Sequence, residues 1–267
     1  MAQGYNIFCD GITVEYFTEC GCFEKTNTDH CHDRYEITYL LSAGGKYIVE
    51  GSEHPAEPGV LLLITPMSYH RVELVSNIAT EGYTIYFGRE SLSSAVASML
   101  DRITAEGRTH GLAFSKNLLS DHLASCFERF SLSERFDESE RNAYMQALLS
   151  EIIILLSATE GERMARSNDE LGARVAEYIN NNIERSISLE RLARRFFVSK
   201  YYLCRAFKSY AGISPHAYIN QKRIIYAKLL IASGMTASRA AERVGFGDYS
   251  AFYRAYTKIV GKSPTAD

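Results

Sequence analysis

Short apolar stretches separated by turns run through residues 5–90 of the chain. Several of them alternate apolar and polar positions, which is the pattern of a strand with one buried face. Their spacing of about ten residues is typical of an antiparallel barrel or sandwich. The stretches are Tyr35–Leu41, Tyr47–Glu50, Val60–Ile64, Arg71–Val75 and Tyr83–Phe87.

From about Ser91 the apolar positions take helical spacing, and helices are predicted over Leu118–Phe130 and Glu140–Ser157. Within the second, Ile152–Leu156 is apolar on nearly all sides. Such a segment must be covered on several sides, so we expect it to pack on its own domain and on a second chain. Packing within one chain is the alternative. The polar residues 158–170 are interpreted as a linker.

The remaining residues, 171–267, carry helical patterns. Four of the predicted helices follow good N-cap residues, because a Ser, Thr or Asp side chain can accept a hydrogen bond from a free N–H group of the first turn. These caps are Ser188, Ser199, Thr236 and Asp248. The helices are predicted over Leu189–Phe196, Lys200–Tyr210 and His216–Ser233, from Thr236 to about Val244, and after Asp248.

One motif occurs twice in this helical region, 49 positions apart. The caps Ser199 and Asp248 keep this offset, but before them Ala193 matches Ala241, so the second turn is one residue longer. Each copy is predicted to be a helix-turn-helix. Two copies suit a periodic partner such as B-DNA, whose major groove returns about every 34 Å. The matched pairs are Arg205 and Arg254, Gly212 and Gly261, Ser214 and Ser263, and Pro215 and Pro264.

The second helix of each module has an apolar face and a face predicted to enter a DNA groove. In the first module the apolar face is expected to be buried, because its residues recur at helical spacing. That face carries Leu203, Ala206, Phe207 and Tyr210, and the opposite face carries Tyr201, Cys204, Arg205 and Lys208. The corresponding face of the second module carries Ser250, Tyr253, Arg254 and Thr257.

The charge of the chain is divided unequally. The whole chain has 29 Lys and Arg against 32 Asp and Glu, a net of −3, which by itself argues against a nucleic-acid-binding protein. Residues 171–267, however, contain 16 basic and 6 acidic residues, a net of +10, and residues 1–170 have a net of −13. This asymmetry indicates a basic nucleic-acid-binding module joined to an acidic module with another task.

The sequence suggests neither export nor membrane insertion. Its apolar runs are too short to cross a bilayer, and its start lacks the pattern of a signal peptide. The six cysteines are too sparse for a disulfide scaffold. A zinc site with Cys20 and Cys22 is disfavoured, because a C-x-C pair without a matched second pair is not a standard zinc spacing. We therefore expect a cytoplasmic protein without a membrane partner.

The C-terminal region resembles the AraC/XylS family of transcription regulators over roughly residues 171–265. Two positions depart from the family pattern: Phe197 stands where a smaller residue is common, and Tyr256 replaces the usual Phe. The resemblance implies two major-groove helices that read successive turns of double-stranded DNA, in a homodimer. It rests on Ala193, Ser199, Leu203, Arg205, Phe207-Lys208, Gly212, Ser214-Pro215, Arg223, Gly245-Phe246, Phe252, Arg254, Gly261 and Ser263-Pro264.

The predicted DNA-binding residues lie on these two helices. Tyr201 and Arg205 are expected to dominate in the first helix, because Cys204 is a poor hydrogen-bonding residue and arginine pairs well with guanine. Arg254 has two open roles, base reading and phosphate contact, and an intramodule salt bridge is the alternative for either arginine. The full set is Lys200, Tyr201, Cys204, Arg205, Lys208, Tyr249, Ser250, Tyr253 and Arg254.

The N-terminal half contains His30-x-His32-x-x-x-Glu36, then Gly44, Pro58-Gly59, Pro66 and His70. This resembles the two cupin motifs, and AraC-type regulators commonly carry such a barrel as a sensor. In metal-binding cupins the three histidines and Glu36 would be the ligands, a set that suits Mn, Fe, Ni or Zn. We expect instead no metal and no cofactor, and a pocket for a small effector such as a sugar or another polar metabolite. Its predicted lining is His30, His32, Arg34, Tyr35, Glu36, Tyr39 and His70.

The expected fold is an α+β chain of two domains. Residues 1–157 would form a cupin-like β-barrel with flanking helices that senses an effector and dimerises, residues 158–170 a linker, and residues 171–267 an all-α tandem helix-turn-helix domain. We expect a sequence-specific transcription regulator without enzyme activity. An activator, which would contact RNA polymerase, is preferred over a repressor, although the sequence leaves both open. The alternative is a metal-dependent cupin enzyme fused to a DNA-binding domain.

Overall fold

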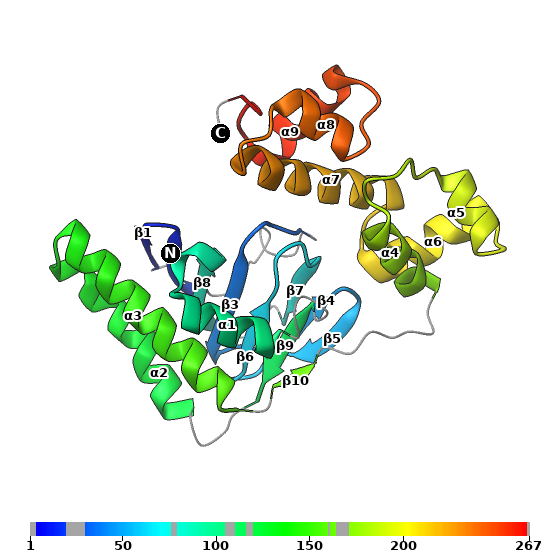
Figure 1. Ribbon diagram of the computed structural model, residues 1–267. Coiled ribbons are helices and arrows are strands. Elements are labelled where there is room, and N and C mark those ends of the chain that lie inside the picture. Colours follow the sequence, from blue (N-terminus) through cyan, green and yellow to red (C-terminus); the bar gives the residue numbers. More distant parts are fainter. Residues whose placement is uncertain are drawn as a thin grey trace. The chain divides into compact units, whose positions relative to one another are not determined.

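The computed structural model describes residues 4–19, 30–75, 79–104, 110–115, 120–159, 161–163 and 171–265. The chain divides into two compact units: Met1–Thr28 and Arg34–Ala165 form the first, and Asp29–Asp33 and Arg166–Asp267 form the second. Figure 1 shows the strands gathered in the first unit, whereas the described residues from 171 onward form helices. No described helix is both long enough and apolar enough to cross a membrane.

The strands of the N-terminal unit form two antiparallel sheets. The larger has the order β1-β2-β8-β3-β6-β9-β10 and the smaller the order β5-β4-β7. Neither order returns to its first strand, so the cupin-like fold appears among the described residues as two open sheets rather than the closed barrel that we expected. The bounds are β1 Tyr5–Cys9, β2 Ile12–Glu19, β3 Tyr35–Ser42, β4 Gly45–Val49, β5 Ser52–Pro55, β6 Leu61–Ile64, β7 His70–Leu74, β8 Thr80–Phe87, β9 Gly111–Phe114 and β10 Glu162–Arg163.

Strand β3 is buried on both faces, and the face turned away from the main core carries polar residues beside a second, smaller hydrophobic cluster. Successive residues of a strand point to opposite faces of the sheet. Ile37 and Tyr39 are buried in the main hydrophobic core, whereas Glu36 and Thr38 are buried on the other side of the strand. This alternation places a carboxylate in the interior of the unit, on the face away from the main hydrophobic core.

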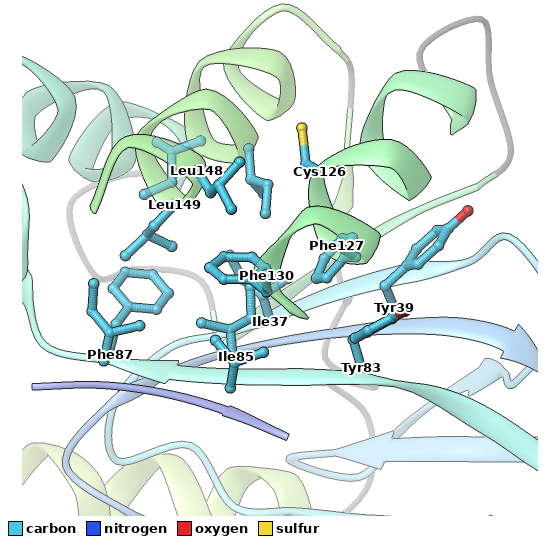
Figure 2. Packing of buried hydrophobic residues seen from close by; sticks show 14 of the residues in the cluster. Ile37, Tyr39, Tyr83, Ile85, Phe87, Cys126, Phe127, Phe130, Leu148 and Leu149 are labelled. Carbon is cyan, nitrogen blue, oxygen red and sulfur yellow. The ribbon is translucent and has the colours of Figure 1, made fainter. Parts of the chain in front are cut away.

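Helices cover the apolar side of the larger sheet. Figure 2 shows Phe127 and Phe130 between the α3 residue Leu148 and the sheet residues Ile37 and Ile85. These aromatic residues are fully buried and dominate the core. The helices of this unit are η1 Arg89–Ser91, α1 Ser94–Ile103, α2 Ser120–Arg129, η2 Phe130–Arg135 and α3 Glu138–Ser157.

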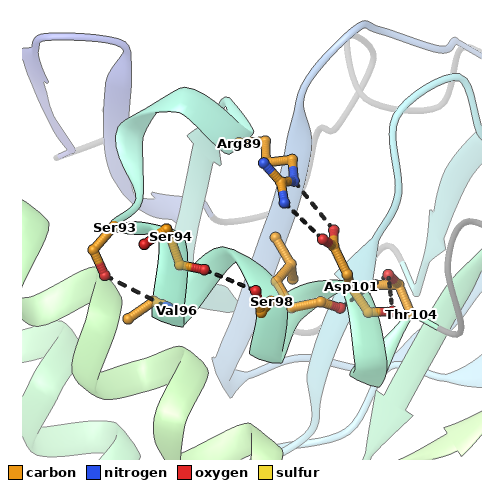
Figure 3. Close-up of polar contacts among 8 residues, drawn as sticks. Arg89, Ser93, Ser94, Val96, Ser98, Asp101 and Thr104 are labelled. Atoms are coloured by element: carbon orange, nitrogen blue, oxygen red, sulfur yellow. Dashed lines mark hydrogen bonds and ion pairs between the residues drawn. The ribbon is translucent and has the colours of Figure 1, made fainter.

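Polar side chains contact helix α1 near both of its ends (Figure 3). Its N-cap, Ser93, accepts a hydrogen bond from the Val96 N–H at 3.4 Å, which satisfies one of the free donors of the first turn. Near the other end, the Arg89 guanidinium forms an ion pair with Asp101 at 2.7 Å. Both residues of this pair are solvent-exposed, so it contributes little to stability.

Two short strands lie outside residues 5–90, the region in which strands were predicted. Strand β9 pairs with β6, but its four residues are all buried and do not alternate, and a short apolar run cannot be assigned from periodicity alone. Strand β10 lies within the expected linker and pairs with β9. Two residues are too few to carry a strand pattern.

Helix α3 begins with a capping box, in which Asp137 accepts a hydrogen bond from the Glu140 N–H and Glu140 accepts one from the Asp137 N–H. Its apolar end packs into its own unit, as one part of our expectation required. Ile152 and Ile153 are fully buried within their own chain, and Ile154 is the residue that remains exposed, at 45%. Ile152 is therefore not available for a contact with a second chain.

The C-terminal unit consists of two helix-turn-helix modules joined by a long helix. All four predicted caps are confirmed: Ser188, Ser199, Thr236 and Asp248 each accept a hydrogen bond from the first turn of the helix that they precede. Helix α7 contributes residues to the core of the second module. The helices are α4 Leu171–Asn181, α5 Leu189–Arg195, α6 Lys200–Ala211, α7 Pro215–Ala232, α8 Ala237–Arg243 and α9 Tyr249–Val260.

Candidate functional site

The second helix of each module, α6 or α9, buries one face and exposes the other. Leu203 and Phe207 of α6 and Phe252 and Tyr256 of α9 are fully buried. The predicted DNA-binding residues lie on the opposite faces, where Tyr201 is 78% exposed. Exposed there are Lys200, Tyr201, Arg205, Lys208, Tyr249, Ser250, Tyr253 and Arg254, and Cys204 is half-buried.

The arginines of these faces are available to a partner. The Arg205 guanidinium lies 6.0 Å from the centre of the Tyr202 ring. Within the residues that the structure describes, neither Arg205 nor Arg254 forms an ion pair, so the salt-bridge alternative finds no support there. Lys200 differs, because it pairs with Glu190 at 2.5 Å.

A buried arginine on α7 connects the turn of the second helix-turn-helix module to the residues that follow α4. Arg223 is 8% exposed and donates hydrogen bonds to the carbonyl oxygens of Ile183, Arg185 and Gly245 at 3.2, 2.6 and 3.0 Å. Burial lowers the pKa of its guanidinium, and the three carbonyls compensate the buried charge. Arg223 therefore helps to fix the turn before α9 relative to the residues that follow α4.

In the N-terminal unit, Glu36 and His70 form a buried pair. The His70 Nε2 and Glu36 Oε2 atoms are 3.1 Å apart, and both side chains are less than one-tenth exposed. Thr38 donates a hydrogen bond to the other Glu36 oxygen at 2.9 Å. Burial opposes the charge on His70, but Glu36 and the Ser68 carbonyl raise the pKa of His70 above its ordinary value. The pair is thus held as a polar centre inside the unit.

Of the four cupin-motif residues, Glu36 and His70 form the polar cluster of the N-terminal unit, whereas His30 and His32 lie in the segment Asp29–Asp33, which groups with the C-terminal unit. The His70 Nδ1 atom lies 3.0 Å from the Ser68 carbonyl oxygen, the contact by which metal-binding histidines are commonly oriented. If Nδ1 donates there, Nε2 can face the Glu36 carboxylate favourably only with a second proton or a cation between them.

A second polar group lies beside this cluster and was missed in the sequence. Buried Glu50 accepts a hydrogen bond from the Tyr69 N–H at 2.9 Å, and its carboxylate is 4.0 Å from His110 Nδ1. The same His110 nitrogen lies 3.3 Å from Ser68 Oγ. Glu50 follows a strand and His110 precedes one, so no local motif joins them.

The structure does not bring Tyr35 and Tyr39 to the Glu36–His70 pair. Tyr35 stacks on Phe87 at 5.4 Å and Tyr39 stacks on Phe127 at 4.9 Å. These odd-numbered positions of β3 point away from Glu36 because side chains alternate along a strand. Arg34 donates a hydrogen bond to Thr13 at 3.0 Å. Tyr47 and Tyr86 are nearer the carboxylate: burial and the charge of Glu36 raise the pKa of both phenols.

A cavity of about 330 Å³ lies elsewhere in the N-terminal unit. Its lining comes from α1, β9 and the end of α3, and includes Met99, Arg102 and Leu112. None of the four cupin-motif residues lines it. The cavity and the polar cluster around Glu36 and His70 are therefore separate features of this unit.

Two family descriptions match the chain. The AraC-like ligand-binding domain matches residues 21–172, more than half of the chain, and a helix-turn-helix domain matches residues 192–266. The HTH-type transcriptional regulator YbfI of Bacillus subtilis is 29% identical over 90% of this chain and 86% of its own length. The transcriptional activator RhaS of Mannheimia succiniciproducens is 24% identical over 74% of this chain and 73% of its own length.

Solved structures with similar chains include the DNA-binding domain of AdpA in complex with a target DNA. It is 27% identical, with a TM-score of 0.35, over 37% of this chain and 89% of that chain. ToxT of Vibrio cholerae is 12% identical, with a TM-score of 0.41, over 96% of both chains. On the two family matches, the chain belongs to the AraC family of transcriptional regulators, with an AraC-like ligand-binding domain joined to a helix-turn-helix DNA-binding domain.

Proposed function

We propose that the chain acts in the cytoplasm as a sequence-specific regulator that reads two successive major-groove faces of its operator and responds to a small polar effector. The duplicated module carries this proposal: α6 and α9 each bury one face and expose a polar and aromatic one. A helix that enters the major groove needs such a free face. The residues proposed for this interface are Lys200, Tyr201, Cys204, Arg205, Lys208, Tyr249, Ser250, Tyr253 and Arg254.

The test compares two residues of α6 on two kinds of DNA. A duplex selected from a random pool by the wild-type chain serves as the operator, and an unselected duplex as the reference. We expect Arg205→Ala to weaken binding to the selected duplex by about tenfold or more and to affect the reference less, because a base contact carries specificity. Lys208→Ala is the matched control and should weaken both about equally. Equal losses for Arg205→Ala would make it a phosphate contact.

We further propose that the regulator is a homodimer that activates transcription and contacts RNA polymerase. Exposed Ile154 on α3 offers an apolar contact point between N-terminal units, and the RhaS relatives are named as activators. Transcription in vitro from a promoter that carries the selected duplex should rise when the chain is added. A fall in transcript would identify a repressor.

For the effector we propose the polar cluster around Glu36 and His70. A buried carboxylate next to a histidine can bind hydroxyl groups of a sugar or a similar metabolite, because one group accepts and the other can donate hydrogen bonds. His30, His32 and Arg34 remain part of this proposal. Tyr35 and Tyr39 remain predictions from the sequence, but their position on the other face of β3 gives them no support.

The same cluster favours a second candidate, a divalent transition metal. In a tetrahedral site the metal–nitrogen distance is about 2.1 Å, so neighbouring ligand atoms lie about 3.4 Å apart. The His70 Nε2 and Glu36 Oε2 atoms, 3.1 Å apart, are near this spacing. Three imidazoles and a carboxylate suit Zn, Ni, Fe or Mn, and the Ser68 carbonyl would orient His70. Bound metal would supply a Lewis acid that fixes a polar effector.

Native mass spectrometry and metal analysis of the full chain separate these candidates. A stoichiometric organic mass that His70→Ala abolishes supports the effector site. One transition metal per chain, lost in His70→Ala and in Glu36→Gln, supports the metal site. Ligand or metal that persists in both variants contradicts the assignment to this cluster. We infer no catalysis, because the named relatives are regulators; conversion of a bound metabolite by the full chain would contradict this inference.

A further inference from the structure

The turn between α5 and α6 contains a phenylalanine with an unfavourable backbone conformation and an exposed ring. Phe197 has a φ of +55°, a left-handed conformation that bulky L-residues rarely adopt. Its side chain is 94% exposed, more than any other large hydrophobic residue that the structure describes. The residue thus combines a strained backbone with an aromatic ring in water, and neither feature stabilises the fold.

The second module shows which residue the turn itself requires. There the equivalent position is Gly245, at a φ of +83°. The hydrogen bonds correspond: the N–H groups of Phe197 and Gly245 donate to Arg194 and Glu242, and the next residues donate to Ala193 and Ala241. Glycine adopts this conformation without strain. The fold therefore does not need the ring of Phe197, and a role outside the fold is indicated.

The surroundings of the ring favour a polyanion. From residue 190 to residue 208 the chain has six basic residues and one acidic one, Glu190, which pairs with Lys200. Phe197 is two residues before the N-cap of α6, the end of a recognition helix that lies nearest the bases in helix-turn-helix proteins. Tyr201, in the first turn of α6, is also strongly exposed. The six basic residues are Arg191, Arg194, Arg195, Lys200, Arg205 and Lys208.

We propose that Phe197 contacts the DNA with its ring, against a thymine methyl group or a deoxyribose at the edge of the groove that α6 enters. Both are apolar surfaces within a phosphate-lined groove, and phenylalanine is among the residues that contact the thymine methyl. The neighbouring cations bind phosphates and hold the ring at the duplex. The contact belongs to the first module alone, because the second has glycine at this position. The proposal rests on DNA binding by the helix-turn-helix domain.

The test uses Phe197→Gly in the full chain and the duplex selected by the wild-type chain. This variant removes the ring and relieves the strain, so its melting temperature should stay level or rise. We expect its affinity for the duplex to fall about tenfold, with an unchanged dependence on salt because no phosphate contact is lost. Phe197→Leu, which keeps an apolar side chain, should retain most of the affinity. Leu229→Ala, at an exposed apolar residue of α7, is the control and should bind normally.

Replacement of each thymine by deoxyuridine, which lacks the methyl group, locates the contact. If one replacement weakens the wild-type chain but not Phe197→Gly, the ring contacts that methyl group. If no replacement is coupled to the variant, the ring contacts deoxyribose. Unchanged affinity in a folded Phe197→Gly chain overturns the proposal and points to a protein partner. Failure of the wild-type chain to bind any selected duplex would instead contradict the proposed function.

Discussion

Arg223 places a permanent charge inside the C-terminal unit and satisfies it with backbone oxygens alone. Three carbonyls from two separate stretches of chain accept its hydrogen bonds. Loss of the guanidinium would leave these acceptors buried without a donor, which costs more than the hydrogen bonds themselves contribute. The side chain is therefore a structural centre of the unit rather than a DNA contact.

We expect Arg223→Met, which keeps the apolar stem but not the donors, to lower the free energy of unfolding by about 3 kcal/mol. Urea denaturation of the full chain, followed by circular dichroism, measures this loss. Arg254→Met at an exposed position is the control, and its stability should change by less than about 0.5 kcal/mol. A similar small change for Arg223→Met would show that water replaces the three hydrogen bonds.

Residues of the candidate sites differed in how far the sequence revealed them. His30, His32 and Glu36 lie within seven positions and carry a recognisable spacing, and His70 completes it at the start of a later strand. Glu50 and His110 lie next to strands of two different sheets, so they come together only in the folded unit and share no motif. Tyr35 and Tyr39 belong to the same strand as Glu36, but the period of two sends them to the other face.

Among the elements, α3 shows the limit of a helical pattern. An apolar surface on all sides indicates that several neighbours cover the helix, but it does not say whether they belong to the same chain. In the structure, Ile152 and Ile153 pack into the core of their own unit and Ile154 points outward. The period of the helix was predicted correctly, and the assignment of its faces required the packed neighbours.

Two substitutions on α3 should therefore behave differently. Ile152→Asp buries a charge and should destabilise the N-terminal unit by roughly 4 kcal/mol or more. Ile154→Asp should leave the fold intact and shift the full chain toward monomer. Analytical ultracentrifugation together with thermal melting separates the two effects. An unchanged dimer for folded Ile154→Asp would exclude this face of α3 as the interface.

Across the whole molecule, the two domains carry net charges of opposite sign. The overall net charge of −3 conceals a net of +10 in residues 171–267. A basic domain binds DNA partly through the release of counterions, so affinity should fall linearly in a plot of log K against log salt. The division of charge and the two-domain organisation were visible in the sequence, whereas the openness of the sheets depended on strand pairing that no local pattern determines.

The salt dependence of DNA binding should show which basic residues of this domain contact phosphates, one substitution at a time. We expect Lys208→Ala to reduce the slope of the log–log plot by about 1, the value for one lost phosphate contact. Binding titrations of the full chain at several salt concentrations, read by fluorescence anisotropy, give the slope. Glu242→Ala, at an exposed acidic position of α8, is the control, because it removes a negative charge instead of a positive one. A slope that Lys208→Ala leaves unchanged would remove Lys208 from the phosphate contacts.

Helix α7 joins the two modules through packed cores at both of its ends. Its Tyr218 packs edge-on against Phe207 of the first module at 5.2 Å, and its Ile224 and Ala227 lie in the core of the second. One inserted base pair rotates the two halves of an operator by about 35° relative to each other. A rigid spacer cannot follow this rotation, so the protein should be intolerant of insertions and read the helical phase of its operator as strictly as its bases.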